Sequence, residues 1–157
     1  METKDQNIVR LMRLIKVVIV DDRHLMRKVI RALLLSIGVQ NIFEAGDGVS
    51  GLEAVCSVAP HLVLLDWDMP AMSGAEFVKK VRSPGNFPQP DVPIVVLTGH
   101  QDRACLADAE RLGVNAYLVK PVLGRALSDC IVSVIALPRP FVRIGDYYGP
   151  EPAQRSA

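Results

Sequence analysis

HLVLLDWDMP, residues 61–70, joins an uninterrupted apolar run to two closely spaced acidic residues. The run at 62–65 has the length and composition of a strand buried on both faces, as in a parallel sheet. Asp66 closes the run, and Asp68 follows after a single tryptophan. One aspartate is an ordinary strand end, whereas two in this spacing raise the alternative of carboxylate chemistry at the end of a buried strand.

The segments on both sides of this stretch alternate between strand and helix patterns. Ser73 is a suitable N-cap for one of the helices. Five strand–helix pairs joined by right-handed crossovers predict an α/β fold, a flavodoxin-like, doubly wound (βα)₅ arrangement around a five-stranded parallel sheet. The predicted strands are 16–20, 41–45, 61–66, 93–98 and 115–119, and the predicted helices are 24–38, 49–59, 73–82, 102–112 and 122–137.

The predicted elements divide the chain into three parts. We expect an N-terminal extension at 1–14, one domain at 15–137 and a C-terminal tail at 138–157, which is too short for a further DNA-binding domain. The last helix is apolar over a wider arc than packing on a sheet requires. One hypothesis is that the tail or a partner covers part of this helix, and the alternative is a disordered tail. The apolar residues of the tail are Phe141, Val142, Ile144, Tyr147 and Tyr148.

Composition and charge exclude several classes of protein. Half of the 157 residues are hydrophobic and the net charge is +1, so we expect a full core and no general attraction to nucleic acid or to an acidic membrane surface. No apolar run reaches the roughly 18 residues of a membrane span, and we expect a cytoplasmic protein. The three cysteines, Cys56, Cys105 and Cys130, have no metal-ligand spacing and are predicted to be buried thiols.

Polar residues close four of the five predicted strands. Asp21 and Asp22 follow the first strand, Asp66 ends the third, Thr98 ends the fourth and Lys120 follows the fifth. Because the carboxyl ends of parallel strands lie at one edge of a sheet, these five side chains are expected to converge there.

Three carboxylates at one edge favour a bound cation. At about 5 Å and an effective dielectric near 20, each pair repels by about 3 kcal/mol. Oxygen ligands with room for water suit Mg²⁺. A carboxylate beside Mg²⁺ can act as a nucleophile toward a phosphoryl group, with the hydroxyl of Thr98 and the ammonium of Lys120 as its contacts. The pattern therefore indicates an aspartyl-phosphate site.

Four motifs resemble the response-regulator receiver domain of two-component signalling. They are VVIVDDRHLMRKVIRALL, LVLLDWDMPAMSG, IVVLTGH and AYLVKP, in the family's order and spacing over about residues 15–137. The resemblance implies a stand-alone response regulator that a histidine kinase or histidine phosphotransfer protein phosphorylates on Asp66. It also implies signalling to an unknown protein target through the face formed by helix 102–112, strand 115–119 and helix 122–137, where a homodimer could form.

The resemblance also assigns the Mg²⁺ ligands. Asp22 would bind the ion directly, Asp21 partly through water, and Asp66 would be the third carboxylate. The backbone carbonyl of Asp68 would complete the protein ligands.

Further roles follow from the resemblance at the other strand ends. Thr98 and Lys120 would contact the phosphoryl group, and the bond from Lys120 to Pro121 would be the family's cis peptide. Thr98 would form a switch with Tyr117, which would turn inward on phosphorylation; an ordinary half-buried strand tyrosine is the alternative.

Asp68 and His100 occupy positions that vary within the family. Each lies two residues beyond a site residue, where a side chain can flank the path of attacking water. We expect the Asp68 side chain to alter the phosphate lifetime and the Mg²⁺ affinity, and His100 to modulate the lifetime as well.

Other functions compete with this interpretation. A haloacid-dehalogenase-type phosphatase also has Asp-x-Asp after an apolar strand, but on its first strand and with its acidic metal pair after the lysine. The order here therefore favours a switch over an enzyme that turns over small substrates. A phosphate sink, a phosphorelay intermediate and a degenerate receiver that only binds partners stay open.

Overall fold

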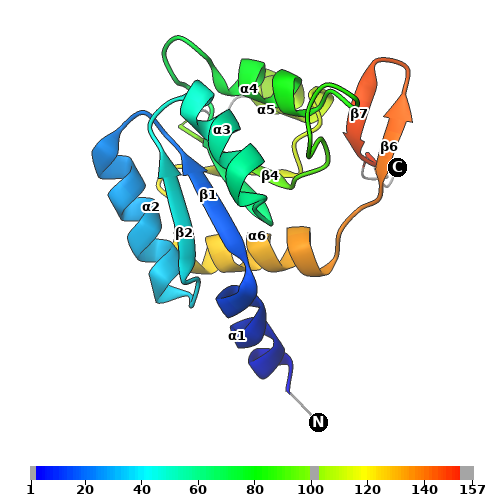
Figure 1. The fold of residues 1–157 in the computed structure, drawn as a ribbon. Coiled ribbons are helices and arrows are strands. Elements are labelled where there is room, and N and C mark those ends of the chain that lie inside the picture. The colour runs from blue at the N-terminus through cyan, green and yellow to red at the C-terminus, as the bar shows by residue number, and fades with distance from the viewer. Residues whose placement is uncertain (1–2, 100–102, 153–157) are drawn as a thin grey trace.

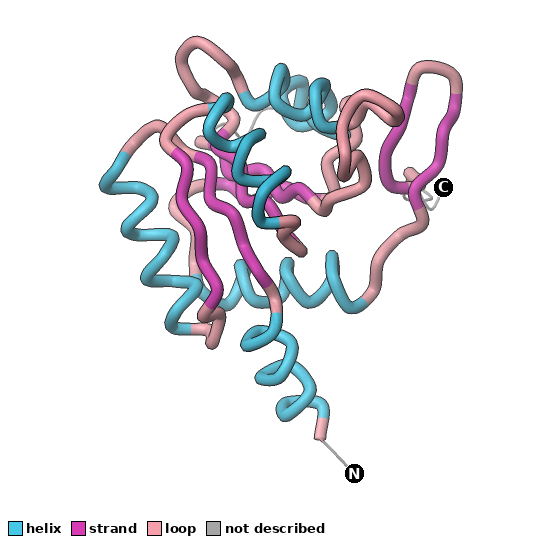
Figure 2. Tube along the Cα trace, viewed as in Figure 1, coloured by secondary structure: helices cyan, strands magenta, loops and turns pink. Residues whose placement is uncertain are grey.

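The structure is a computed structural model, and it describes residues 3–99 and 103–152. A five-stranded sheet lies between helices, and a two-stranded hairpin lies apart from it (Figures 1 and 2). No helix in these two ranges is long and apolar enough to cross a membrane. In chain order the elements are α1 (Lys4–Leu14), β1 (Lys16–Val20), α2 (His24–Ser36), β2 (Asn41–Ala45), α3 (Gly48–Val58), β3 (Leu62–Asp66), α4 (Gly74–Val81), β4 (Ile94–Thr98), α5 (Arg103–Arg111), β5 (Ala116–Val119), α6 (Gly124–Ala136), β6 (Phe141–Ile144) and β7 (Tyr147–Pro150).

The large sheet confirms the predicted α/β fold. Its strand order is β2-β1-β3-β4-β5, and all four pairings are parallel. The chain moves from β1 to one side for β2 and to the other side for β3, so the order reverses between β1 and β3. Open α/β sheets bind ligands at this point, outside the carboxyl ends of the strands.

Alternate residues of the strands pack into two separate cores. Val17 and Ile19 of β1 lie in the core beneath α2 and α6, whereas Val18 and Val20 face α3, α4 and α5. The side-chain alternation of a strand places these residues on opposite faces. Both faces are covered, which explains why β1, β3 and β4 read as continuous apolar runs.

The N-terminal segment forms an additional helix, α1. Thr3 and Gln6 make a reciprocal capping box at its start. Met12 is fully buried in the same core as the inner side chains of α6, and Ile8 and Leu11 pack against that core. The segment expected as an N-terminal extension therefore contributes to the core of the domain.

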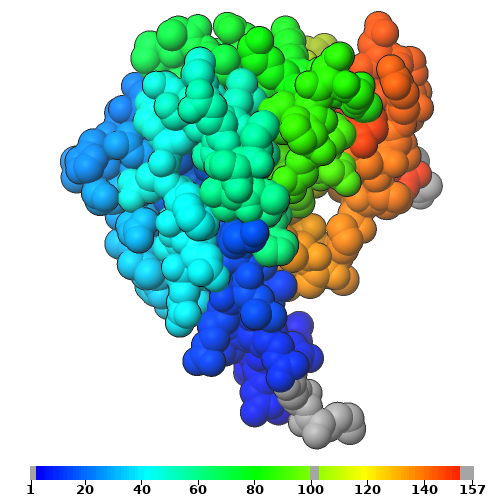
Figure 3. Space-filling view, in the orientation of Figure 1, coloured from blue at the N-terminus to red at the C-terminus, as the bar shows by residue number. Residues whose placement is uncertain are grey.

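The tail folds into the hairpin β6–β7. Arg82, at the C-terminal end of α4, lies over the Phe141 ring with 4.8 Å between Cζ and the centroid. The backbone of Gly149 approaches Gly113 so closely that a Cβ on Gly113 would lie 2.5 Å from the Tyr148 carbonyl oxygen. The hairpin thus docks beside α4 and the turn between α5 and β5, against the green part of the chain in Figure 3. These contacts involve α4 and the turn between α5 and β5, whereas the hypothesis placed the tail on α6.

Arg82 is a buried cation beneath the hairpin. Its guanidinium donates to the carbonyls of Gly113, Pro90 and Val92 and to Asn115 Oδ1, at 2.7–2.9 Å. Burial lowers the pKa of Arg82 to about 10, opposed mainly by the Asp91 charge, so the group stays charged at neutral pH. The side chain therefore joins the end of α4, the loop before β4 and the turn before β5.

One sequence prediction about the cysteines was wrong. Cys56 is exposed on α3, whereas Cys105 and Cys130 are partly buried. Cys56 lies on the solvent side of α3, so the apolar residues beside it in the sequence do not imply that it is buried.

Candidate functional site

The carboxyl ends of β1 and β3 bring three carboxylates together. Val20 pairs with Leu65, so Asp21 and Asp66 follow side by side at the reversal of strand order. One oxygen from each of Asp21, Asp22 and Asp66 lies within 4.8 Å of the others. Asp21 and Asp66 are buried and Asp22 is exposed. The convergence expected from the parallel topology is present for these three carboxylates.

Lys120 faces this cluster from the end of β5. Its Nζ lies 3.1 Å from Asp66 Oδ1 and 3.8 Å from Asp21 Oδ2. Its backbone N–H donates to the Thr98 carbonyl at 2.7 Å, which fixes its position relative to β4. The peptide bond between Lys120 and Pro121 is cis. The ammonium therefore lies beside two of the three carboxylates.

Asp21 has an oxygen that the described residues do not satisfy. Its Oδ1 accepts a hydrogen bond from the Arg23 backbone N–H at 2.9 Å. Its Oδ2 is buried and has no hydrogen-bond partner within residues 3–99 and 103–152, with Lys120 as a neighbouring cation. A buried, unsatisfied carboxylate oxygen next to two further carboxylates fits a hard cation such as Mg²⁺.

The environment of Asp66 makes its charged form less favourable than that of an exposed aspartate when no cation is bound. Burial raises the pKa of the Asp66 carboxyl, and the charge of Asp21 raises it further. Lys120 and the backbone N–H of Asp68 act in the opposite direction without cancelling the rise. The cluster therefore holds electrostatic strain that a bound cation would relieve.

In metal-free buffer, Asp66→Asn is expected to raise the free energy of unfolding at neutral pH, because it removes a desolvated charge that Asp21 repels. The pKa of this carboxyl is higher in the folded than in the unfolded chain, so the charged carboxylate destabilises the fold. The destabilisation is complete above the folded pKa and absent below the unfolded pKa of about 4. The gain should shrink as the pH falls toward about 4. Urea unfolding with a chelator at both pH values measures it, and equal stabilities at neutral pH would contradict it.

The loop after β3 folds back over the strand end. The Gly74 N–H donates to the Trp67 carbonyl at 3.0 Å, and a Cβ on Gly74 would lie 2.8 Å from the Trp67 Cα. Only glycine permits this approach. Asp68 is exposed, and its backbone N–H bonds to the Asp66 carboxylate. The two aspartates of the Asp-Trp-Asp stretch thus have different environments.

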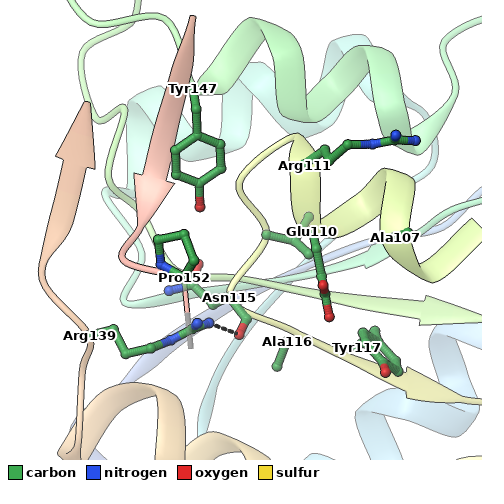
Figure 4. A pocket seen from close by; sticks show the side chains of 10 residues that line it. Ala107, Glu110, Arg111, Asn115, Ala116, Tyr117, Arg139, Tyr147 and Pro152 are labelled. Atoms are coloured by element: carbon green, nitrogen blue, oxygen red, sulfur yellow. Dashed lines mark hydrogen bonds between the residues drawn. The ribbon is translucent and has the colours of Figure 1, made fainter. Parts of the chain in front are cut away.

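Tyr117 lines a cavity between the sheet edge and the hairpin. The cavity has a volume of about 530 Å³, and Tyr117 is 36% exposed within it. Figure 4 shows Glu110 of α5 beside Tyr117 and Tyr147 of the hairpin on the far side. Tyr117 is therefore turned outward, and the tail supplies part of the wall around the same cavity.

Of the two predicted site residues at and just after the end of β4, Thr98 is among the described residues and His100 is not. Thr98 is buried at the end of β4, next to the strand that carries Asp66. His100 lies outside the described residues. The structure therefore places Thr98 at the strand end where its role was expected. It gives no position with which to assess the role of His100.

Arg27 is a neighbour of the site that the sequence analysis missed. Its Nη1 donates to the Asp21 carbonyl at 2.8 Å, and its Nε lies 3.4 Å from Glu44 Oε1. Arg27 lies on α2, six residues after Asp21, and Glu44 comes from β2. The only signal in the sequence was an arginine on the first turns of the helix that follows the acidic pair.

Comparison with known proteins agrees with this geometry. The model of the response regulator receiver domain matches residues 17–132. The chain belongs to the response regulator receiver family. The chemotaxis protein CheY1 of Helicobacter pylori is similar to this receiver, with 36% identity over 121 residues, which are 76% of this chain and 96% of that protein.

Solved structures show the same architecture. The receiver superimposes on the chemotaxis protein CheY4 of Vibrio cholerae with a TM-score of 0.70 and 28% identity, over 78% of this chain and 99% of that one. The receiver domain of a sensor histidine kinase from Pseudomonas aeruginosa has a TM-score of 0.69 at 24% identity, over 78% and 98% of the two chains, and was solved with magnesium in its active site cleft.

The family determines the general function. This receiver is a phosphorylation-activated response regulator of two-component signalling. The relatives named above are chemotaxis proteins and a receiver domain, and the order of motifs remains the argument against a phosphatase. The hairpin β6–β7 lies beyond residue 132, where the family match ends.

Proposed function

We propose that this receiver accepts a phosphoryl group on Asp66 from a histidine kinase or a histidine phosphotransfer protein. The observation that carries this proposal is the position of Asp66, which is buried at the end of β3 and flanked by Asp21 and Lys120. Asp22 is exposed and Asp21 is held by hydrogen bonds at its carboxylate and backbone. Asp66 is thus the carboxylate that strand β3 presents at the centre of the site.

The transfer exchanges one bond to phosphorus for another. An Asp66 carboxylate oxygen attacks the phosphorus, the bond from phosphorus to the donor histidine nitrogen breaks, and the nitrogen keeps the electron pair. Lys120 Nζ balances charge on the phosphoryl oxygens, and the Thr98 hydroxyl donates to one of them. The positions of these groups at neighbouring strand ends support the assignment.

Mg²⁺ is the proposed cofactor. When bound, it offsets the repulsion between the carboxylates and the incoming phosphoryl group. Asp21, Asp22 and Asp66 would hold it, with the Asp68 carbonyl as a fourth protein ligand. The unsatisfied Oδ2 of Asp21 supports this set.

Thr98 and Tyr117 are the proposed switch. Phosphorylation would draw Thr98 toward the phosphoryl group, and Tyr117 would leave its outward position. This change alters the face of α5, β5 and α6, which would bind a downstream protein or a second copy of the receiver. Asp68 and His100 would adjust how long the phosphoryl group persists.

The receiver unit is proposed to span residues 15–137, with α1 as an N-terminal extension and the hairpin in the tail. The family match at 17–132 lies within this unit. A role as phosphate sink or phosphorelay intermediate uses the same site and differs only in the fate of the phosphoryl group. A receiver that only binds partners would not need three clustered carboxylates with Lys120 beside two of them.

Incubation with acetyl phosphate and Mg²⁺, followed by intact mass spectrometry, tests the proposal. We expect the mass of one phosphoryl group to be added to the wild-type chain, and none to be added when a chelator is present. A chain whose mass does not change under conditions in which Mg²⁺ is bound would favour the binding module.

A further inference from the structure

Asp21 takes part in three hydrogen bonds, and in one of them the donor is the side chain of another residue. Its backbone N–H donates to the Ala45 carbonyl at 3.1 Å, and its Oδ1 accepts from the Arg23 backbone N–H at 2.9 Å. Its backbone carbonyl accepts from Arg27 Nη1 at 2.8 Å. These bonds leave the buried Oδ2 as the carboxylate oxygen without a hydrogen-bond partner in the described part of the chain.

Arg27 is itself fixed by the neighbouring strand. Its Nε lies 3.4 Å from Glu44 Oε1 at the end of β2. Its guanidinium also rests against the turn after β2, since a Cβ on Gly46 would lie 3.4 Å from Nη1. The side chain is 16% exposed. Arg27 therefore connects the turn that carries the acidic pair to the end of the adjacent strand.

Glu44 forms ion pairs with several basic side chains of α2. Lys28 Nζ lies 3.2 Å and Arg31 Nη1 3.3 Å from Glu44 Oε2. Burial raises the pKa of Glu44, but the hydrogen bond and charge of Lys28 and the charges of Arg31 and Arg27 lower it overall. Glu44 is thus a charged anchor, and Arg27 is the member of this group whose contacts extend to Asp21.

We propose that Arg27 is a positioning residue that presets the Asp21 backbone so that Asp21 Oδ2, which accepts no hydrogen bond from the described residues, and the Asp22 carboxylate receive Mg²⁺. This inference rests on the proposed cation site. Arg27 would not contact the ion; it would act through the peptide that carries a ligand, as groups around metal ligands do. Without it, the turn between β1 and α2 would have to be ordered when the ion binds.

Arg31 provides a matched control. It lies one turn further along α2 and also reaches Glu44. Its other contact is the Ile42 carbonyl at 3.5 Å, away from the carboxylate cluster. Arg31→Met removes the same charge and the same kind of ion pair as Arg27→Met and leaves the Asp21 carbonyl bonded.

Titration with Mg²⁺ alone, followed by the fluorescence of Trp67, tests the proposal without phosphorylation. Trp67 is the single tryptophan and directly follows Asp66. We expect Arg27→Met to raise the Kd for Mg²⁺ by about tenfold, the lower end of the range for groups that orient metal ligands. Arg31→Met should change it less than twofold, and Arg27→Lys, which keeps a donor but not the planar fork, should fall between them.

Three outcomes overturn the proposal. The first is an unchanged Kd in Arg27→Met, and the second is an equal loss in Arg27→Met and Arg31→Met, which would assign the effect to Glu44 or to general charge. If Arg27→Met does not fold in a far-ultraviolet circular dichroism control, Arg27→Lys takes its place. The third outcome is then an Arg27→Lys protein whose Kd for Mg²⁺ equals that of Arg31→Met. If wild type binds no Mg²⁺, the proposed cation site fails instead, which the same titration shows separately.

Discussion

Lys120→Met is expected to slow phosphoryl transfer from acetyl phosphate by about 10²-fold or more. The Lys120 ammonium lies 3.1 Å from Asp66 Oδ1 and is largely buried, so no solvent cation replaces it easily. Loss of one such preorganised group costs about 10² to 10³ in rate. The rate of mass increase under saturating Mg²⁺ measures the effect.

Two controls separate this role from a general effect of charge. Lys80→Met removes an exposed lysine of α4 and should leave the rate within twofold. Mg²⁺ binding by Lys120→Met should be kept or become tighter, because a cation that competes for the carboxylates is gone. A Lys120→Met protein phosphorylated at the wild-type rate would remove Lys120 from the proposed chemistry.

Arg82→Met is expected to lower the free energy of unfolding by about 3 to 5 kcal/mol. The change leaves the carbonyls of Gly113, Pro90 and Val92 without their charged donor, and buried acceptors that lose a partner cost about 1–3 kcal/mol each. It also removes the cation over the Phe141 ring. Urea unfolding, with the hairpin followed by hydrogen exchange, measures both consequences.

Arg139→Met is the matched comparison for Arg82→Met. Arg139 donates to the carbonyls of Asn115 and Glu151 but is exposed, so water can replace it (Figure 4). Its loss should cost about 1 kcal/mol or less. An equally small loss in Arg82→Met would show that the buried guanidinium does not hold the hairpin to the domain.

The sheet and the strand-end residues could be predicted because they depend on short-range rules. A run such as 16–20 is a strand by composition, and parallel pairing then places Asp21, Asp66 and Lys120 at one edge without further information. The starts and ends of the five strands of the large sheet differed from the prediction by one residue at most, because each apolar run ends at a polar residue or a glycine.

The hairpin was missed although the sequence carries a signal for it. Gly145 and Asp146 form a two-residue connection between Ile144 and Tyr147, and Gly145 has φ +59. Such a glycine-containing pair between apolar runs is typical of a β-hairpin. The prolines around the short strands obscured it, because proline usually argues against a strand.

The contacts of Arg27 and Arg82 could not be predicted from spacing. Arg82 bonds to Gly113, 31 residues later, and Arg27 reaches the end of a strand that lies beside it only in the folded sheet. On a helix, both side chains read as ordinary surface charges. Their partners are mainly backbone carbonyls, which carry no signature in a sequence.

Mapping the phosphoryl group after treatment with acetyl phosphate and Mg²⁺ tests the central claim most directly. Fragmentation of the phosphorylated chain at low pH, where an acyl phosphate survives, distinguishes Asp66 from Asp21 and Asp22. We expect the group on Asp66 alone, and no added mass in Asp66→Asn. A phosphoryl group on Asp21 or Asp22, or an unchanged yield in Asp66→Asn, would contradict the assignment of Asp66 as the phosphoacceptor.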